Sequence, residues 1–389
     1  MKSKGKIFAL LLVLVLLFQS CGAKPEDLGD VASAETYLPT VSLDVSTSAE
    51  SAVLIDASAG DSHILWEQNA HQRRPMASTT KIMTALVAAE SLPLSTKVTI
   101  PKEAVGVEGS SVYLAEGEVL TLEELLYCLL LQSANDAAVA IAYAVSGSVS
   151  DFAVLMNEKA RQLGLSDTQF KNPHGLDENG HYTTAYELGV IASKALENEK
   201  IRQIFSTYRA TVSGRDGEYR HLINHNRLLN SYDGCLGMKT GYTQSSGRCL
   251  VSAAERDGLV LIAVTLACRN DWQEHTALLD AGFGSFRRVC LGDGENIFSP
   301  ALTLPEIKLS GAVQSTLRTA LLSPVWVTLP VGTDGIECTI ESERLLFAPQ
   351  ASGRCVGKVR WSVGNKLIAE ETLVVAHSAA RRSKISFWW

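Results

Sequence analysis

Two apolar helical segments, separated by a short polar break, constrain the fold of this chain more than any other feature. Residues 122–131 read LEELLYCLLL and residues 137–145 read AAVAIAYAV, so apolar residues occupy most sides of both helices. Thr121 and Glu124 form a capping-box pattern at the start of the first helix, and Gly147 ends the second; Thr184 and Glu187 have the same capping-box pattern farther along the chain. A helix that is apolar all round is buried, so a large domain must surround the pair. The polar break at 132–136 then lies inside that domain.

Length and charge limit the classes of function. The chain has 389 residues, which is long enough for two domains with a sizeable core. Its formal net charge is -7, and its interior contains no long basic run. Binding to a phosphate backbone depends on clustered Lys and Arg, so we expect no nucleic-acid partner.

The N-terminus has the pattern of an export signal. Three lysines precede an apolar run from Ile7 to Phe18, which is shorter than the roughly 18 to 20 residues that a membrane-spanning helix needs. Cys21, in the context QSCG, resembles the lipidated cysteine of bacterial lipoproteins, although Phe18 stands where Leu is usual. Ordinary cleavage nearby is the alternative. We therefore predict a lipoprotein-like signal peptide over 1–21 and a location at the extracytoplasmic face of the bacterial cytoplasmic membrane.

The remaining cysteines give no sign of a metal centre. Seven of them follow Cys21, and none forms a C-x-x-C pair, so we expect neither a metal nor a cofactor. Cys128 and Cys268 lie in apolar runs and are predicted core thiols. Cys338 and Cys355 are candidates for a disulfide in an oxidising compartment.

Beyond the signal, the chain divides into a tether, a mixed domain and a β-rich module. Residues 22–48 are rich in Ser, Thr and Ala and predict a tether. Residues 49–290 include a β-hairpin over 51–69, the apolar helices, two antiparallel strands (RCLVSAAE and LVLIAVTLA) and a closing helix, DWQEHTALLDAGFGSF. Short alternating runs over 296–377 predict a small all-β domain.

The C-terminal tail, residues 378–389, ends in ARRSKISFWW. Basic and aromatic side chains together are typical of a membrane interface, whereas a frayed end explains them equally well. The tail is therefore a second candidate contact with the membrane surface, after the lipid expected at Cys21.

A serine and a lysine in the segment RPMASTTKIMTAL are the first candidate catalytic pair. Ser78 and Lys81 are three residues apart, which on a helix puts the amine on the face of the hydroxyl, one turn on. Burial lowers the pKa of a lysine, and a neutral amine can take the proton from a serine nucleophile. Pro75 places Ser78 in the first helical turn, where free backbone N–H groups favour developing negative charge. A buried serine beside a lysine that reaches solvent is the alternative.

Two further motifs supply complementary groups. In the break between the apolar helices, Ser133 is placed to relay a proton, and Asn135 to hold a substrate amide through its donor and its acceptor. Lys239-Thr240-Gly241 begins a strand pair, where a cation and a hydroxyl would bind a carboxylate and the glycine would let substrate approach the strand edge. An interhelical turn capped by Asn135 or Asp136, and a simple edge lysine with a bulge glycine, are the structural alternatives.

Three motifs, in their order and spacing, resemble those of the penicillin-recognising serine enzymes: Ser78-Thr79-Thr80-Lys81, Ser133-Ala134-Asn135 and Lys239-Thr240-Gly241. The longer stretches RRPMASTTKIMTAL, SANDAAVAIA, NPHGLDENGHYTTAYELG and GMKTGYTQSSGRCLV are similar to the serine-type D-alanyl-D-alanine carboxypeptidases, the low-molecular-weight penicillin-binding proteins of peptidase S11 type. The likeness covers roughly 51–286. It implies an α/β fold of the β-lactamase/transpeptidase type, an antiparallel sheet with helices plus a helical subdomain, followed by a small all-β C-terminal domain.

The resemblance also implies a reaction and a set of roles. Ser78 would attack the carbonyl between the two terminal D-alanines of a peptidoglycan stem peptide, with Lys81 as base and Ser133 passing a proton to the leaving amine. Asn135 would bind the peptide, while Lys239 and Thr240 would hold the terminal carboxylate. The backbone N–H groups of Ser78 and Tyr242 would form the oxyanion hole. β-Lactam antibiotics would acylate the same serine.

Departures and rivals accompany the resemblance. Some relatives have His in place of Tyr242, and many use an additional Arg to grip the carboxylate, for which Arg269 is the nearest candidate. His174 and Asp177 are expected to border the cleft or to hold their loop. A β-lactamase of the same fold would need an acid such as Glu158, Asp177 or Glu178, and a non-catalytic wall-binding lipoprotein would keep the fold alone. His221 and His225 lack the His-Glu-x-x-His pattern of a zinc peptidase.

Overall fold

The computed structural model describes residues 41–58, 62–298 and 302–382. The predicted signal peptide, Cys21, most of the tether, the turn at 59–61 and the last residues of the tail lie outside the described residues. By its contacts the chain separates into two compact units, and each is described by itself. One holds Leu38–Leu304 with Ser323–Gly335, and the other holds Pro305–Leu322 with the chain from Ile336 onward. The predicted domain boundaries stay predictions.

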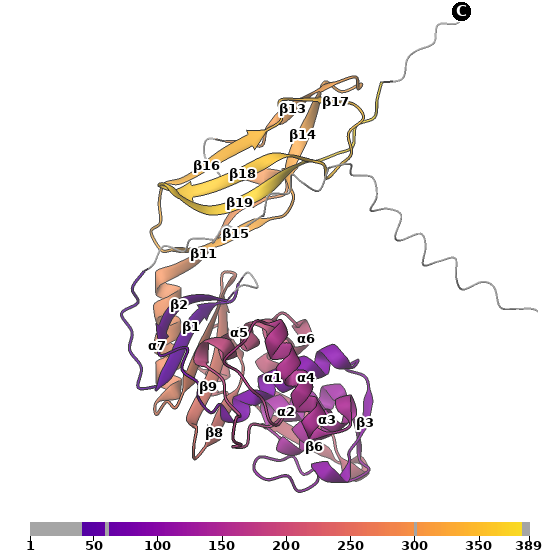
Figure 1. Ribbon diagram of the computed structural model, residues 1–389, viewed down its shortest axis with the longest axis vertical. Coiled ribbons are helices and arrows are strands. Elements are labelled where there is room, and N and C mark those ends of the chain that lie inside the picture. The colour runs from indigo at the N-terminus through magenta and orange to yellow at the C-terminus, as the bar shows by residue number, and fades with distance from the viewer. Residues whose placement is uncertain (1–40, 59–61, 299–301, 383–389) are drawn as a thin grey trace, which may run out of the picture. The chain divides into compact units, whose positions relative to one another are not determined.

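An antiparallel sheet forms the centre of the larger unit (Figure 1). Its order is β2-β1-β10-β9-β7, and β8 also pairs with β9. The predicted hairpin within 51–69 and the predicted strand pair are confirmed. The bounds are β1 Ser51–Asp56, β2 His63–Gln68, β7 Cys235–Gly237, β8 Thr240–Thr243, β9 Gly247–Arg256 and β10 Leu259–Leu266.

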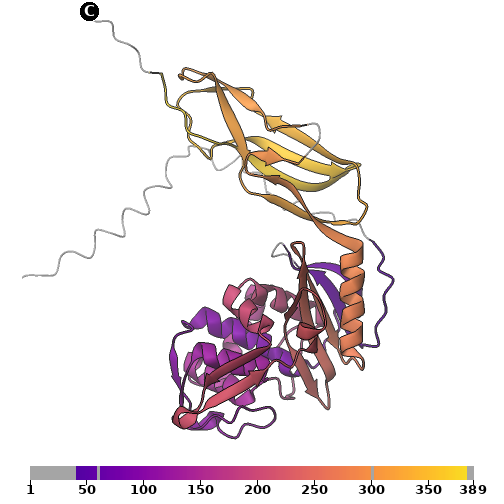
Figure 2. The same cartoon turned by 180° about the vertical axis from the view of Figure 1, so that it is seen from behind.

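Helices cover both faces of this sheet, which explains why its central strands are apolar throughout. Helix α5 (Ala185–Leu196) packs on one face, where a Cβ on Gly189 would meet Ile55 and Val264. Helix α7 (Asp271–Ser285) packs on the other, where a Cβ on Gly282 would meet Leu261 and Leu54. Figures 1 and 2 show α7 on one side of the sheet and the cluster of other helices on the opposite side. The closing helix predicted from the sequence is α7.

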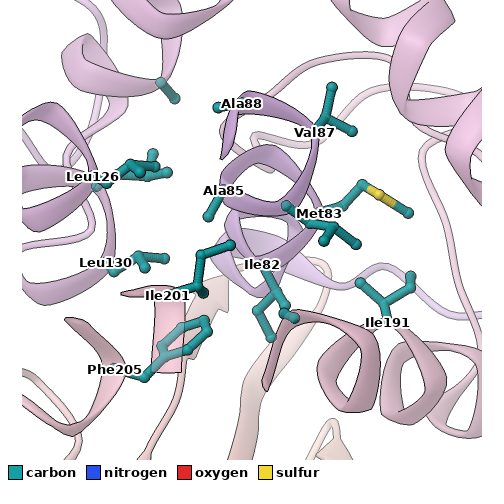
Figure 3. Packing of buried hydrophobic residues seen from close by; sticks show 14 of the residues in the cluster. Ile82, Met83, Ala85, Val87, Ala88, Leu126, Leu130, Ile191, Ile201 and Phe205 are labelled. Atoms are coloured by element: carbon teal, nitrogen blue, oxygen red, sulfur yellow. The ribbon is translucent and has the colours of Figure 1, made fainter. Parts of the chain in front are cut away.

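Helix α1 (Lys81–Ser91) is the centre of the helical cluster, and a short 3-10 helix, η1 (Ala77–Thr80), leads into it. Figure 3 shows Ile82, Met83 and Ala85 of α1 among side chains of the neighbouring helices. Those neighbours include Leu126 and Leu130 of α2, Ile191 of α5, and Ile201 and Phe205 of α6. The remaining bounds are α2 Leu122–Leu131, α3 Asn135–Ser146, α4 Val149–Gln162 and α6 Glu199–Ser206. The helix that carries the first motif is therefore enclosed, as its apolar sequence predicts.

The predicted capping boxes differ in outcome. At the start of α2, the side chains of Thr121 and Glu124 each accept from the other's backbone N–H, so this box is complete. At α5, Thr184 accepts from the backbone N–H of Glu187, but the Glu187 carboxylate accepts from the backbone N–H groups of Ser166 and Asp167 instead. Only half of the second predicted box forms, because the carboxylate closes a different loop.

Short pairs of strands and short 3-10 helices complete the larger unit. Strands β3 (Lys97–Thr99) and β4 (Val119–Thr121) pair, as do β5 (Arg209–Ser213) and β6 (Tyr219–Ile223). Strands β11, β12 and β15 form a three-stranded sheet. The bounds are β11 Phe286–Asp293, β12 Asn296–Ile297, β15 Val325–Pro330, η2 Lys102–Ala104, η3 Arg215–Gly217 and η4 Arg227–Asn230.

The smaller unit is all-β, as predicted. Its sheet has the order β16-β18-β19-β14-β13-β17. The bounds are β13 Glu306–Ser310, β14 Thr316–Leu321, β16 Ile336–Ser342, β17 Leu345–Phe347, β18 Cys355–Val363 and β19 Lys366–Val375.

The prediction of a disulfide between Cys338 and Cys355 is wrong. Cys338 lies opposite Trp361, six residues farther along β18 than Cys355. At about 3.3 Å per residue the two are on the order of 20 Å apart, and a disulfide needs Cα atoms within about 7 Å. All seven cysteines of the described residues carry free thiols, and the predicted core thiols Cys128 and Cys268 are buried.

Within the described residues, no single helix has both the length and the apolar composition to cross a membrane. Helices α3 and α4 reach the length and apolar composition of a membrane span only when taken together, and they are bent by 82° relative to each other. Helix α3 belongs to the buried core.

Candidate active site

All three predicted motifs contribute to one cleft in the larger unit. The cavity is about 520 Å³ in volume and is lined by Ser78 of η1, Ser133 of the turn between α2 and α3, and Thr240, Gly241 and Tyr242 of β8. Lys81, Asn135 and Lys239 lie behind this lining and are almost fully buried. The sequence motifs, which are far apart along the chain, thus meet at one place.

The hydroxyl of Ser78 and the amine of Lys81 are in direct contact. Ser78 Oγ lies 2.8 Å from Lys81 Nζ, because the 3-10 turn continues into α1 and keeps the two side chains on one face. Nζ also lies 2.7 Å from Asn135 Oδ1 and 2.7 Å from the backbone oxygen of His174. A neutral amine has two N–H donors and one lone pair. It can therefore donate to both oxygens while accepting from the Ser78 hydroxyl.

Burial favours this neutral form of Lys81. The side chain is 0% exposed, and desolvation holds its pKa well below the usual value for lysine. The positive charge of Lys239 lowers the pKa of Lys81 further, and the Asp136 carboxylate opposes this shift. The alternative of a lysine that reaches solvent is excluded by the burial.

Strained backbone conformations mark each motif. The φ values of Ala77, Ser133 and Met238 are 47°, 59° and 92°. Residues other than glycine rarely adopt such positive φ values. Ala77 precedes the nucleophile candidate, and Met238 precedes the KTG strand. Such conformations persist where surrounding structure over-determines them, and they concentrate at active sites.

The loop NPHGLD holds the first motif from one side. Gly175 packs so closely on η1 that a Cβ there would lie 1.9 Å from the backbone oxygen of Ala77. The backbone oxygen of His174 accepts from Lys81, whereas the ring Nδ1 of His174 accepts from the N–H of Leu176 within the loop. Burial lowers the pKa of His174 to about 3, so the ring is neutral. His174 therefore contacts the candidate site through its backbone.

Asn135 is engaged with protein groups at both ends of its amide. Its Oδ1 accepts from Lys81, and its Nδ2 donates to the backbone oxygen of Glu108 at 2.6 Å. Helix α3 begins at Asn135 with Ala134 as its N-cap and without a side-chain cap, so the alternative in which Asn135 or Asp136 caps the helix is wrong. The amide positions the base in this structure, and its predicted contact with substrate stays a prediction.

The hydrogen-bond pattern of β8 leaves alternate backbone groups open to the cleft. Lys239 and Val251 exchange both backbone hydrogen bonds, at 3.1 and 2.9 Å. In an antiparallel ladder the next residue points its N–H and C=O away from the partner strand, and β8 pairs only with β9 among the described strands. The backbone groups of Thr240 and Tyr242 therefore face the free edge. The N–H of Tyr242 is available there as an oxyanion donor.

Gly241 allows β8 to approach the nucleophile candidate. A Cβ at this position would lie 3.0 Å from the Ser78 nitrogen and 3.1 Å from both Ala77 Cβ and the Met76 oxygen. Any other residue would push β8 away from η1. The close approach brings the backbone of Ser78 next to β8, which an oxyanion hole built from the N–H groups of Ser78 and Tyr242 requires.

Lys239 lies beside this edge as a second buried lysine. It is 1% exposed, and its Nζ donates to the backbone oxygen of Thr240 at 2.9 Å. Desolvation lowers the pKa of Lys239 to about 7. Near neutral pH it is therefore poised between a charged and a neutral form, and a bound carboxylate would favour the charged form.

A group of residues at one end of the cleft was not predicted from the sequence. Arg248 of β9 lies opposite Tyr242, and its guanidinium makes two hydrogen bonds to the Asp271 carboxylate, at 3.0 and 2.9 Å. Arg227 stacks on the ring of Trp272. The hairpin register of β8 and β9 is the sequence signal that could have placed Arg248 beside Tyr242. The Arg269 candidate considered from the sequence does not line this cleft.

The other residues singled out from the sequence have different positions. Asp177 accepts from the hydroxyl of Thr243 at 2.8 Å, and Glu158 forms an ion pair with Arg161 on α4. His225 lines the cleft, whereas His221 contacts Thr211 between β5 and β6. No group of three or more His, Cys, Asp or Glu residues suited to a metal occurs among the described residues.

Comparison with known proteins identifies relatives that cover most of the chain. The family model described as D-alanyl-D-alanine carboxypeptidase (Peptidase S11) matches residues 38–270. The D-alanyl-D-alanine carboxypeptidase DacF of Bacillus subtilis is 31% identical over 349 residues, which cover 87% of this chain and 88% of that protein. The D-alanyl-D-alanine carboxypeptidase of Streptomyces sp. strain K15 is 39% identical over 54% of this chain and 77% of its own length.

Solved structures of penicillin-binding proteins resemble this chain over most of its length. Penicillin binding protein 5 of Haemophilus influenzae superposes with a TM-score of 0.69 at 27% identity, over 86% of this chain and 98% of that one. Penicillin binding protein 6B of Escherichia coli has a TM-score of 0.68 at 26% identity, over 87% of this chain and 99% of that one. The predicted α/β fold with a C-terminal β domain is confirmed.

Proposed function

Because the chain belongs to the D-alanyl-D-alanine carboxypeptidase family, peptidase S11, we propose that Ser78 is the nucleophile with which this serine carboxypeptidase removes the terminal D-alanine of a peptidoglycan stem pentapeptide. The contact that carries the proposal is the 2.8 Å approach of Ser78 Oγ to a fully buried Lys81. It joins a hydroxyl to an amine whose pKa desolvation holds well below the usual value for lysine, which favours the neutral form.

The acylation step follows from these contacts. The Ser78 hydroxyl gives its proton to the neutral amine of Lys81, and Oγ bonds to the carbonyl carbon between the two D-alanines. Negative charge develops on the carbonyl oxygen, which accepts from the N–H groups of Ser78 and Tyr242. The C–N bond then breaks, and the leaving nitrogen takes a proton through the hydroxyl of Ser133, which lines the same cleft. Water later hydrolyses the ester and frees the serine.

The terminal carboxylate of the substrate requires a cation at one end of β8. Lys239 and Thr240 supply an ammonium and a hydroxyl there. Arg248, next to Tyr242 in the hairpin, adds a guanidinium whose orientation is fixed by Asp271. A free C-terminus is therefore recognised by charge, as removal of a single terminal residue requires.

Labelling with a fluorescent penicillin tests the nucleophile. The wild-type chain should form a stable covalent adduct, because a β-lactam presents a strained amide to the same serine, and Ser78→Ala should form none. Ser91→Ala, at the end of the same helix, is the control and should label like the wild type. An adduct that persists in Ser78→Ala would refute the assignment, and absence of labelling in the wild type would favour a non-catalytic wall-binding protein.

We also propose that the protein is exported and held at the outer face of the cytoplasmic membrane, by a lipid on Cys21 and by contact of its C-terminal tail. The sequence pattern before Cys21 and the basic and aromatic residues of the tail support this; the segment before Cys21 and the tail after Arg382 lie outside the described residues. Mass spectrometry of the mature N-terminus should find a diacylated cysteine at position 21. A mature chain that begins after Cys21 would contradict the lipid anchor.

A further inference from the structure

A second cavity lies next to the cleft and shares residues with it. Its volume is about 470 Å³, and Tyr242 and Arg248 line both cavities. The second cavity extends past the end of β8 to Gln244 and Ser245, in the turn between β8 and β9. The roles proposed for Ser78, Lys81 and Lys239 leave this cavity unused.

Guanidinium groups dominate its lining. Arg74, Arg248 and Arg269 contribute to it, against a single carboxylate from Glu50. Glu50 pairs with one nitrogen of Arg74, while the buried Nε of Arg74 has no partner among the described residues. Arg269 is exposed and makes no hydrogen bond or ion pair within the described part of the chain. Because Arg248 is paired with Asp271 and Arg74 with Glu50, Arg269 is the guanidinium of this lining that stays free to bind an anion.

The direction of a bound peptide brings its upstream part to this cavity. A substrate that pairs with the free edge of β8 runs antiparallel to it, with its C-terminus near Lys239 and Thr240. Its preceding residues then pass Tyr242 and Thr243 and reach the turn at Gln244. The second cavity, which Arg269 lines, is also lined by Tyr242 and by Gln244 of that turn.

We infer that this cavity is a subsite for a carboxylate carried by the stem peptide upstream of its two D-alanines, with Arg269 as the principal contact. The inference rests on the proposed function. A stem peptide offers this chemistry in two places: the α-carboxylate of a γ-linked glutamate at its second residue, and the side-chain carboxylate of a diaminopimelate at its third. Amidation of either removes the charge. The enzyme would thereby discriminate between free and amidated peptides.

Steady-state release of D-alanine tests the subsite. Four N-acetylated pentapeptides are compared. Two have lysine as the third residue and carry either a free or an amidated α-carboxylate on the second residue. The other two have an amidated second residue and carry diaminopimelate, with its side-chain carboxylate free or amidated, as the third. Arg269→Gln should lower kcat/KM about three- to tenfold on the peptide whose carboxylate occupies the subsite, mainly through KM. It should leave the corresponding amidated peptide unchanged. The peptide that responds identifies which carboxylate binds.

Matched variants separate recognition from structural damage. Arg209→Gln, at an exposed position of β5, should change none of the four values, and Arg269→Lys should restore part of the lost kcat/KM. An equal loss on free and amidated peptides, or no loss on any of them, would overturn the subsite. If the wild type released no D-alanine from any peptide, the proposed function would fail instead.

Discussion

Replacing Gly241 by alanine should weaken the oxyanion hole while leaving the fold intact. The added Cβ would lie 3.0 Å from the Ser78 nitrogen and 3.1 Å from Ala77 Cβ and the Met76 oxygen. Ordinary contacts of a Cβ begin near 3.4 Å, so β8 and η1 must separate by a few tenths of an ångström. Both segments are backbone, and Ala77 is already held in a strained conformation, so neither can adjust cheaply.

The size of the effect follows from the geometry of the donors. A donor must lie about 2.7 to 3.1 Å from the oxyanion to stabilise it, and loss of one donor costs roughly a hundred- to a thousandfold in rate. A shift of a few tenths of an ångström at the Tyr242 N–H weakens that donor without removing it. We therefore expect acylation to slow by about a hundredfold.

The assay is the second-order rate of acylation by a fluorescent penicillin, together with kcat/KM for D-alanine release and a thermal melt. Gly284→Ala is the matched control, because no atom lies within 4 Å of a Cβ at this exposed position of α7 and its φ is ordinary. It should keep the wild-type rates and gain up to about 1 kcal/mol of stability. If Gly241→Ala acylates at the wild-type rate with an unchanged melt, the close approach of β8 to Ser78 does not build the oxyanion hole.

Three further outcomes are expected. The kcat/KM of D-alanine release should fall as pH rises through the pKa of Lys239, near 7, because the cation that holds the carboxylate is lost; Lys239→Arg should move this falling limb to higher pH. Gly175→Ala should cost roughly 3 kcal/mol in a denaturant melt, since its Cβ would lie 1.9 Å from the Ala77 oxygen, whereas Gly164→Ala, with a positive φ of 75° but open space, should cost about 1 kcal/mol. Nitrocefin should acylate the enzyme but turn over far more slowly than D-alanine is released, and rapid nitrocefin hydrolysis without D-alanine release would identify a β-lactamase.

Local patterns in the sequence were sufficient for most of the secondary structure. The capping box at Thr121 predicts the start of α2, and Gly147, with a φ of 81°, ends α3 as expected. The strands β9 and β10 follow from their apolar runs and the Asp257-Gly258 turn, where both residues have positive φ. In each case the determining residues lie within a few positions of the element they define.

Contacts between distant segments could not be predicted in this way. Half of the box at Thr184 is lost because Glu187 closes the loop at Ser166, about twenty residues away along the chain. Whether Cys338 and Cys355 could meet depended on the register of β16 against β18. Arg248 was overlooked because its place beside the cleft depends on how β8, β9 and the start of α7 come together.

The two buried lysines show why one cleft needs both local and distant contacts. The proposed reaction requires Lys81 neutral and Lys239 charged, although both are the same residue and both are desolvated. The charge on Lys239 lowers the pKa of Lys81, so the two requirements support each other. A substrate carboxylate that pairs with Lys239 would keep it protonated and so hold Lys81 in the form that accepts the Ser78 proton. Binding of the correct C-terminus would then prepare the base, a coupling that no single motif contains.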